Sequence, residues 1–191
     1  MDDQDAITRI KLGDPAGLEP LVERYQVRAV SAAYLVLQER APAEDVVQSA
    51  FLKVFDRIHT FDDALPFAPW FFRIVINDAV KSARERSRFS SLPDGSDEDA
   101  RELAAWLVDP GALPEVQVEQ REERDCLRRA LLQLAPEHRG AVVMRYYLEM
   151  DAAEMAVGMD RPVSTVKWWL RAARKHLGAI LHSEIQPKEK E

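Results

Sequence analysis

The sequence predicts an all-α fold in which two small helical domains are joined by an acidic flexible linker. Apolar residues recur at steps of three and four over most of the chain, which is the spacing of one helix face. No segment of useful length alternates apolar and polar residues as a half-buried strand does. Residues 93–118 instead hold prolines, glycines and a dense acidic run, as linkers do. We therefore expect domains at 1–92 and 119–183, followed by a disordered tail at 184–191.

Three helices are expected in the N-terminal domain. Asp14-Pro15 begins the first, and Pro20 is expected to delay its start or kink it. Apolar pairs spaced by four mark the second helix, and the third begins at Trp70 after a loop that contains prolines. The expected ranges are 14–37, 42–58 and 70–88.

The C-terminal domain is expected to end in a helix-turn-helix over residues 151–177, after a helix at 118–134 and another from Pro136. Asp151 can cap its first helix, and the segment from Gly158 to Pro162 interrupts it. An apolar stripe marks the second helix: Val166, Leu170, Ala173 and Leu177. Small polar and basic side chains on its other face suit a helix that lies in a DNA major groove.

The charge distribution is compatible with DNA binding although the net charge is −7. Residues 93–125 alone carry a net −8, whereas residues 126–191 carry a net +3. The chain has one cysteine, Cys126, and its four histidines show no ligand spacing, so neither a disulfide nor a metal site is expected. No phosphate-binding glycine loop or nucleophile–base motif is apparent, so we expect no enzyme activity and no cofactor.

No membrane insertion is expected. No apolar run approaches 18 residues, and the acidic N-terminus lacks the apolar core of a signal peptide. The expected location is therefore the cytoplasm.

Four motifs occur in a fixed order along the chain: AEDVVQSAFLKVF (43–55), PWFFRIVINDAVKSARERSR (69–88), LLQLAPEHRGAVVMRYY (131–147) and VSTVKWWLRAARKHL (163–177). This order resembles the extracytoplasmic-function (group 4) sigma factors of the bacterial primary-sigma family. The resemblance implies a dissociable RNA polymerase subunit without catalysis or a small-molecule substrate. Region two would bind core polymerase and open the minus-ten promoter element, and region four would read the minus-thirty-five element. It also implies control by an anti-sigma factor, which can hold such a protein at the membrane.

The resemblance implies a core polymerase-binding surface on the helix that contains Glu44, Asp45 and Gln48. Carboxylates and an amide can bind arginines of a partner helix through charge-assisted hydrogen bonds. The alternative is a solvated face, with acidic residues favoured in the first turn by the helix dipole.

For the minus-ten element the resemblance implies Phe61, Arg73, Asn77, Lys81 and Arg84. Phe61 would stack on an extruded base or, alternatively, plug the domain core. Asn77 suits a base edge and the cations suit phosphates, although a solvated polar stripe is the alternative. Asp62 and Asp63 depart from the family, which usually has a basic residue after Phe61, and their charge would repel DNA unless they read a cytosine amino group.

For the minus-thirty-five element the resemblance implies Ser164, Thr165, Lys167, Trp168, Arg171, Arg174 and Lys175. Trp169 and Ala172 stand where relatives usually keep arginine, and Trp169 is expected at the edge of the core. Fewer cations should lower DNA affinity and flatten its salt dependence. Trp168 would meet a thymine methyl group or an inhibitory protein.

Two other functions remain open from the sequence. One is a sigma-like decoy that binds an anti-sigma factor without initiating transcription. The other is a helix-turn-helix repressor with an N-terminal oligomerisation domain. Trp106, within the linker, belongs either to a short docking helix or to the exposed tether.

Overall fold

The computed structural model describes residues 2–89 and 125–185, and within these ranges the chain is helical without β-strands. The all-α fold expected from the sequence is thus confirmed. The expected linker at 93–118, with Trp106, lies outside the described residues, as do residues 186–191. The last helix extends to Ile185, so it includes the first two residues of the expected tail.

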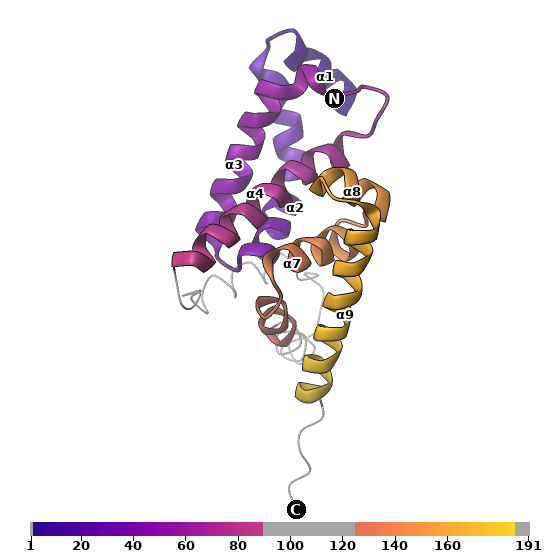
Figure 1. Ribbon diagram of the computed structural model, residues 1–191. Helices are drawn as coiled ribbons and strands as arrows, with labels where there is room; N and C mark the ends of the chain where they lie inside the picture. Colours follow the sequence, from indigo (N-terminus) through magenta and orange to yellow (C-terminus); the bar gives the residue numbers. More distant parts are fainter. Residues whose placement is uncertain (1, 90–124, 186–191) are drawn as a thin grey trace, which may run out of the picture.

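The N-terminal half consists of four α-helices: α1 (Asp3–Lys11), α2 (Leu18–Leu37), α3 (Arg40–Arg57) and α4 (Phe67–Phe89). Helices α2, α3 and α4 pack against one another, and α1 lies across the end of α2 (Figure 1). The sequence prediction missed α1. This helix is short and mostly polar, but Asp2 caps its N-terminus and Ile7 and Ile10 bury its apolar side.

Prolines stand at the third position of α2, α3 and α4: Pro20, Pro42 and Pro69. The first four N–H groups of a helix have no intrahelical acceptor, so a proline there removes no hydrogen bond. Helices α2 and α4 begin before these prolines. Asp14 instead caps a 3-10 turn (Pro15–Gly17), so α2 begins at Leu18, later than expected but before Pro20. Helix α4 begins at Phe67 rather than at Trp70.

The C-terminal half contains a helical segment at 125–132, α7 (Pro136–Val142), a π-helical turn (Val143–Tyr147), α8 (Ala152–Met159) and α9 (Val163–Ile185). Helices α8 and α9 form the expected helix-turn-helix. Asp151 and Glu154 make a reciprocal capping box at the start of α8, and Asp160 ends α8 in the left-handed conformation. The π-helical turn was not predicted.

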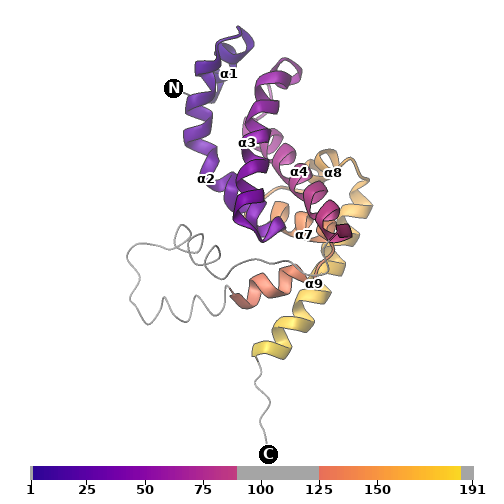
Figure 2. The same cartoon turned by 90° about the vertical axis from the view of Figure 1, so that its left-hand side faces the viewer.

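The two halves pack against each other through α4. This helix contacts α7 and α8, and α2 contacts α7 and the π-helical turn (Figures 1 and 2). Buried side chains of both halves, among them Ile76 and Met144, belong to one continuous apolar cluster. A Cβ atom at Gly140 would lie 2.6 Å from Val80 Cγ2, so α7 approaches α4 so closely that a larger residue there would force Val80 or the helices to shift.

Candidate nucleic-acid interface

Helix α9 exposes most of the residues predicted to contact the minus-thirty-five element. Its buried side, formed by Val166, Leu170 and Ala173, faces the helices of its own half. Six of the predicted residues are exposed on the opposite side: Ser164, Lys167, Trp168, Arg171, Arg174 and Lys175. Thr165 is half-buried next to them. The structure therefore brings these residues together on one free helix face, as DNA-reading helices require.

An aromatic cluster lies beside the N-terminus of α7. The rings of Trp168 and Trp169 lie 5.4 Å and 6.3 Å from the His138 ring, centroid to centroid. Trp169 is half-buried against the core, as expected, whereas 58% of Trp168 is exposed. Burial lowers the pKa of His138, and the charge of His176 lowers it further, while Glu137 acts in the opposite direction.

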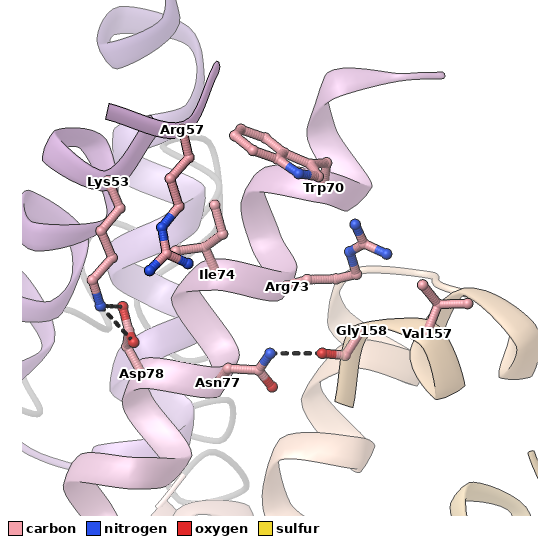
Figure 3. A pocket seen from close by; sticks show the side chains of 9 residues that line it. All are labelled: Lys53, Arg57, Trp70, Arg73, Ile74, Asn77, Asp78, Val157 and Gly158. Carbon is pink, nitrogen blue, oxygen red and sulfur yellow. Dashed lines mark hydrogen bonds and ion pairs between the residues drawn. The ribbon is translucent and has the colours of Figure 1, made fainter. Parts of the chain in front are cut away.

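Two of the α4 residues predicted to contact the minus-ten element, Arg73 and Asn77, face the C-terminal half (Figure 3). Asn77 Nδ2 donates a 2.6 Å hydrogen bond to the carbonyl oxygen of Gly158. The side chain of Arg73 lies so close to Gly158 that an added Cβ would be 2.6 Å from its Cγ and Cδ. Arg84 forms an ion pair with Glu137. Three of the five predicted residues thus contact α7 or α8 in this arrangement.

A pocket of about 280 Å³ opens at this junction between α3, α4 and α8. Arg57 and Arg73 contribute positive charge to it, while Lys53 is ion-paired to Asp78 at 2.7 Å. Trp70 and Val157 supply apolar surface. Lys81, further along α4, is exposed.

Phe61 lies in the core, with 4% of its surface exposed. Its ring centroid is 5.1 Å from that of Trp70 and 5.9 Å from that of Phe67. This is the location expected of a hydrophobic plug, so base stacking by Phe61 would require the side chain to leave the cluster. The stacking role remains a prediction.

The acidic loop after Phe61 is held by its own contacts. Lys11 Nζ lies 2.8 Å from both carboxylate oxygens of Asp63, and it also donates to the Phe61 carbonyl at 3.1 Å. The Asp62 carboxylate accepts a hydrogen bond from the backbone N–H of Ala64. The charge of Asp63 is therefore partly compensated, which lessens the repulsion of DNA expected from the sequence.

A separate groove of about 560 Å³ runs between α2 and α3. Glu44, Asp45 and Gln48, the residues predicted to bind core polymerase, form part of its wall. Its apolar lining consists of Leu18, Val22, Val30, Val47, Phe51 and Leu52. An apolar groove with carboxylates along it suits an amphipathic partner helix that carries basic residues.

The sequence prediction missed the residues that connect the two halves. Arg139 is 7% exposed, and its Nη1 donates to the Val36 carbonyl oxygen of α2 at 2.5 Å. Arg28 of α2 donates to the Tyr147 carbonyl oxygen at 3.1 Å. Gly140, which lies against Val80 of α4, gives a weak sequence signal, because an isolated glycine in a helical pattern costs about 1 kcal/mol relative to alanine.

The comparisons with known proteins agree with this architecture. The chain matches the family models "Sigma-70 region 2" over residues 21–89 and "Sigma-70, region 4" over residues 124–177. It is 26% identical to the ECF RNA polymerase sigma factor SigW of Bacillus subtilis, covering 90% of this chain and 92% of the relative. It is 30% identical to the ECF RNA polymerase sigma-E factor of Escherichia coli, covering 97% and 95%.

Two solved structures share the fold. CnrH in complex with the cytosolic domain of CnrY matches with a TM-score of 0.65 at 23% identity, covering 95% of this chain and 97% of that one. The sigma factor RpoE of Bartonella quintana, in complex with the anti-sigma factor NepR, matches with a TM-score of 0.59 at 21% identity, covering 86% and 95%. No helix among the described residues is long and apolar enough to cross a membrane. Given the two regions matched in order and 30% identity over nearly both full lengths, this chain belongs to the ECF RNA polymerase sigma factors of the sigma-70 family.

Proposed function

We propose that the chain binds core RNA polymerase and directs it to promoters by contacting DNA at two points. The observation that carries this proposal is the free face of α9, where six of the seven predicted residues are exposed together. In this proposal α9 reads the minus-thirty-five element, and Arg73, Asn77, Lys81 and Arg84 of α4 hold the minus-ten strand. The protein acts in the cytoplasm as a non-enzymatic subunit.

The groove between α2 and α3 is the proposed polymerase-binding site. Its carboxylates would pair with basic side chains of a polymerase helix, while its apolar lining packs against that helix. Reversal of charge at Glu44 or Asp45 should therefore weaken binding of core polymerase. Asp56→Lys is the matched control, because Asp56 is also exposed on α3 but does not line the groove.

The deciding experiment is run-off transcription with purified core polymerase and a library of promoter fragments. The full chain should direct initiation from a defined subset of fragments, and Asp45→Lys should abolish it while Asp56→Lys does not. A chain that binds no core polymerase would refute the proposal. Duplex binding by the chain alone, without any effect of polymerase, would instead indicate a repressor.

We further propose that an anti-sigma factor controls the protein. A solved relative of the same fold is in complex with the anti-sigma factor NepR, as its description states. Exposed apolar side chains remain available for such a partner, among them Leu52 in the lining of the groove and Trp168 on α9. If that partner is membrane-anchored, the sigma factor would be held at the membrane. Affinity purification from the native host should recover a small protein that excludes polymerase.

A further inference from the structure

The loop that leads into α4 is anchored at both ends by aromatic side chains in the core. Phe61 is 4% exposed and Phe67 is 3% exposed, and their ring centroids lie 5.9 Å apart. Residues 62–66 between them are all exposed. They form a tight turn, in which the Leu65 N–H donates to the Asp62 carbonyl oxygen at 3.0 Å. We call residues 62–66 the loop tip.

Helix α1 supplies further contacts to this loop. Lys11 Nζ lies 2.8 Å from each carboxylate oxygen of Asp63 and donates to the Phe61 carbonyl oxygen at 3.1 Å. Gln4 Nε2 donates to the Asp63 carbonyl oxygen at 2.9 Å. Gln4 and Lys11 are about two helical turns apart, so both side chains leave the same face of α1. One face of α1 therefore binds three acceptor groups on Phe61 and Asp63.

Lys11 determines both the shape and the charge of the loop tip. Its ammonium group carries three donor hydrogens, and its acceptors lie on Phe61 and Asp63, so it fixes the chain on both sides of Asp62. Asp62 and Asp63 are the charged residues of the loop tip, and Lys11 compensates one of their two negative charges. Without Lys11, a DNA strand near the loop tip would meet a freer chain with two uncompensated carboxylates.

The ion pair of Lys11 with Asp63 contributes little to global stability. The two side chains are 24% and 55% exposed, and ion pairs at such positions add little to the free energy of unfolding. Order in a binding loop acts differently, because a loop that is ordered beforehand loses less conformational freedom when it binds. Loss of Lys11 should therefore leave the melting temperature nearly unchanged and still weaken a step that needs the loop tip in one conformation.

We infer that Lys11, assisted by Gln4, is a positioning residue for minus-ten recognition: α1 holds the loop tip in the conformation that receives an extruded base. The inference rests on the proposed function, since that function places the minus-ten strand on α4. Arg73 lies about 9 Å along α4 from Phe67, so a strand held by Arg73 comes within reach of the loop tip. Lys11 and Gln4 act through the loop and need not contact the DNA themselves.

Two double variants keep the net charge of the wild type and differ in whether an ion pair can form. Lys11→Glu/Asp63→Lys exchanges the two charges, and Lys11→Met/Asp63→Asn removes both. If only net charge mattered, both would behave as wild type. Positioning by Lys11 predicts that the exchanged pair recovers most of the function, whereas the neutral pair stays as defective as Lys11→Met.

Two single variants complete the set. Lys11→Arg keeps a charged donor that can reach Asp63, so it should retain most of the function. Arg9→Met is the matched control, because Arg9 is on the same helix but pairs with Asp14, in the turn after α1. Arg9→Met should behave as wild type in the measurements on the loop tip and on promoter opening.

Order in the loop tip is measured in the full chain without polymerase. Nitrogen-15 relaxation gives backbone order parameters for Ala64 and Leu65, and a rigid backbone has a value of about 0.85. Wild type and Arg9→Met should lie near this value. Lys11→Met should lower it, and Gln4→Ala/Lys11→Met should bring it below about 0.6. A mobile loop tip in the wild type, or a fully ordered one in Gln4→Ala/Lys11→Met, would overturn the inference.

Promoter opening is measured with core polymerase on a fragment that the wild type transcribes. Permanganate reactivity of unpaired thymines reports the opened region. If the receptive conformation falls to about one-fifth of the molecules, opening by Lys11→Met falls about fivefold. Affinity for core polymerase and the melting temperature should stay nearly unchanged. Wild-type opening by the neutral pair Lys11→Met/Asp63→Asn would reduce the contact to a charge effect and overturn the inference.

The same measurements separate this inference from the proposed function. If the wild type initiates and Lys11→Met opens the promoter equally well, positioning by Lys11 is refuted and the proposed function stands. If no form of the chain initiates with core polymerase, the proposed function fails and the minus-ten role of Lys11 fails with it. The order parameters then decide by themselves whether α1 holds the loop tip.

Discussion

The guanidinium of Arg139, in α7, donates to the carbonyl oxygen of Val36 at the end of α2, across 103 residues of sequence. Its Nη2 donates to the Leu132 and Leu134 carbonyls of its own half, at 3.2 Å and 3.0 Å. Burial lowers the pKa of Arg139 to about 10, so the side chain remains charged at neutral pH. A charged donor that binds three carbonyls through Nη1 and Nη2 therefore connects the two halves.

Arg139→Met should destabilise the protein, because it leaves these buried carbonyls without a donor. Loss of a buried hydrogen-bond partner costs about 1–3 kcal/mol, so we expect a decrease in the free energy of unfolding in that range. Urea unfolding followed by circular dichroism measures the change. Arg139→Lys keeps the charge but has fewer directed donors, and it should fall between wild type and Arg139→Met. Equal stability of wild type and Arg139→Met would contradict the prediction.

The contacts between the halves could not be predicted from the sequence. Asn77 and Gly158 are 81 residues apart, and Arg28 and Tyr147 are 119 apart, so no local spacing relates them. The acceptors are backbone carbonyls, which every residue carries. Helical periodicity predicted the helices because burial of one face repeats every three or four residues, but it does not say which helices of separate halves meet.

Other differences have local causes. Helix α1 escaped prediction because its nine residues bury only Ala6, Ile7 and Ile10, too few for a clear period. The sequence leaves two roles open for Phe61, because an aromatic side chain in a loop before a helix can either stack on a DNA base or pack into the domain core. The free face of α9 was predicted correctly because Val166, Leu170 and Ala173 define the opposite, buried face by their spacing alone.

His138 should make stability sensitive to mild acid. Its pKa is lowered below 6.5 in the folded protein, mainly by burial, so the unfolded chain binds this proton more readily. The contribution is complete above pH 6.5 and is lost as the pH falls from 6.5 through the lower, folded-state pKa. His138→Phe keeps a ring beside Trp168 and Trp169 but cannot titrate.

Melting temperatures measured from pH 7.5 to pH 5 test this assignment. The wild type should lose more thermal stability across that interval than His138→Phe does. His59→Phe is the matched control, because His59 is exposed on the turn that follows α3. Identical pH profiles for wild type and His138→Phe would assign the acid sensitivity to other groups.

Phe61→Ala should destabilise region two through loss of packing. The side chain is buried among Phe67 and Trp70, and truncation of a buried phenylalanine to alanine costs about 3–5 kcal/mol. Phe61→Leu should cost much less, because it keeps most of the volume. Chemical denaturation of both variants gives the two values. A cost below about 1 kcal/mol for Phe61→Ala would mean that Phe61 is not held in this cluster.

The capping box of α8 should contribute to the stability of the helix-turn-helix. Asp151 accepts hydrogen bonds from the N–H groups of Ala153 and Glu154, and Glu154 accepts from the Asp151 N–H. Asp151→Ala should cost about 1 kcal/mol, whereas Asp151→Asn should cost little because asparagine is also a good N-cap. Thermal unfolding of the full chain measures both. Equal losses for the two variants would assign the effect to the charge rather than to the cap.

Lys167 and Arg171 should determine much of the salt dependence of duplex DNA binding, because both are exposed on the free face of α9 that we propose to bind DNA. Each phosphate contact contributes about 0.9 to the slope of log K against log salt concentration. Lys167→Ala and Arg171→Ala should each reduce the slope of the full chain by up to about one, and the double variant by up to about two. Arg40→Ala, which removes one positive charge at the start of α3, should leave the slope unchanged. Trp169 is packed at the edge of the core, so Trp169→Arg added to Lys167→Ala should not restore the salt dependence of DNA binding. If it restored the wild-type slope in full, residue 169 would have to contact the DNA.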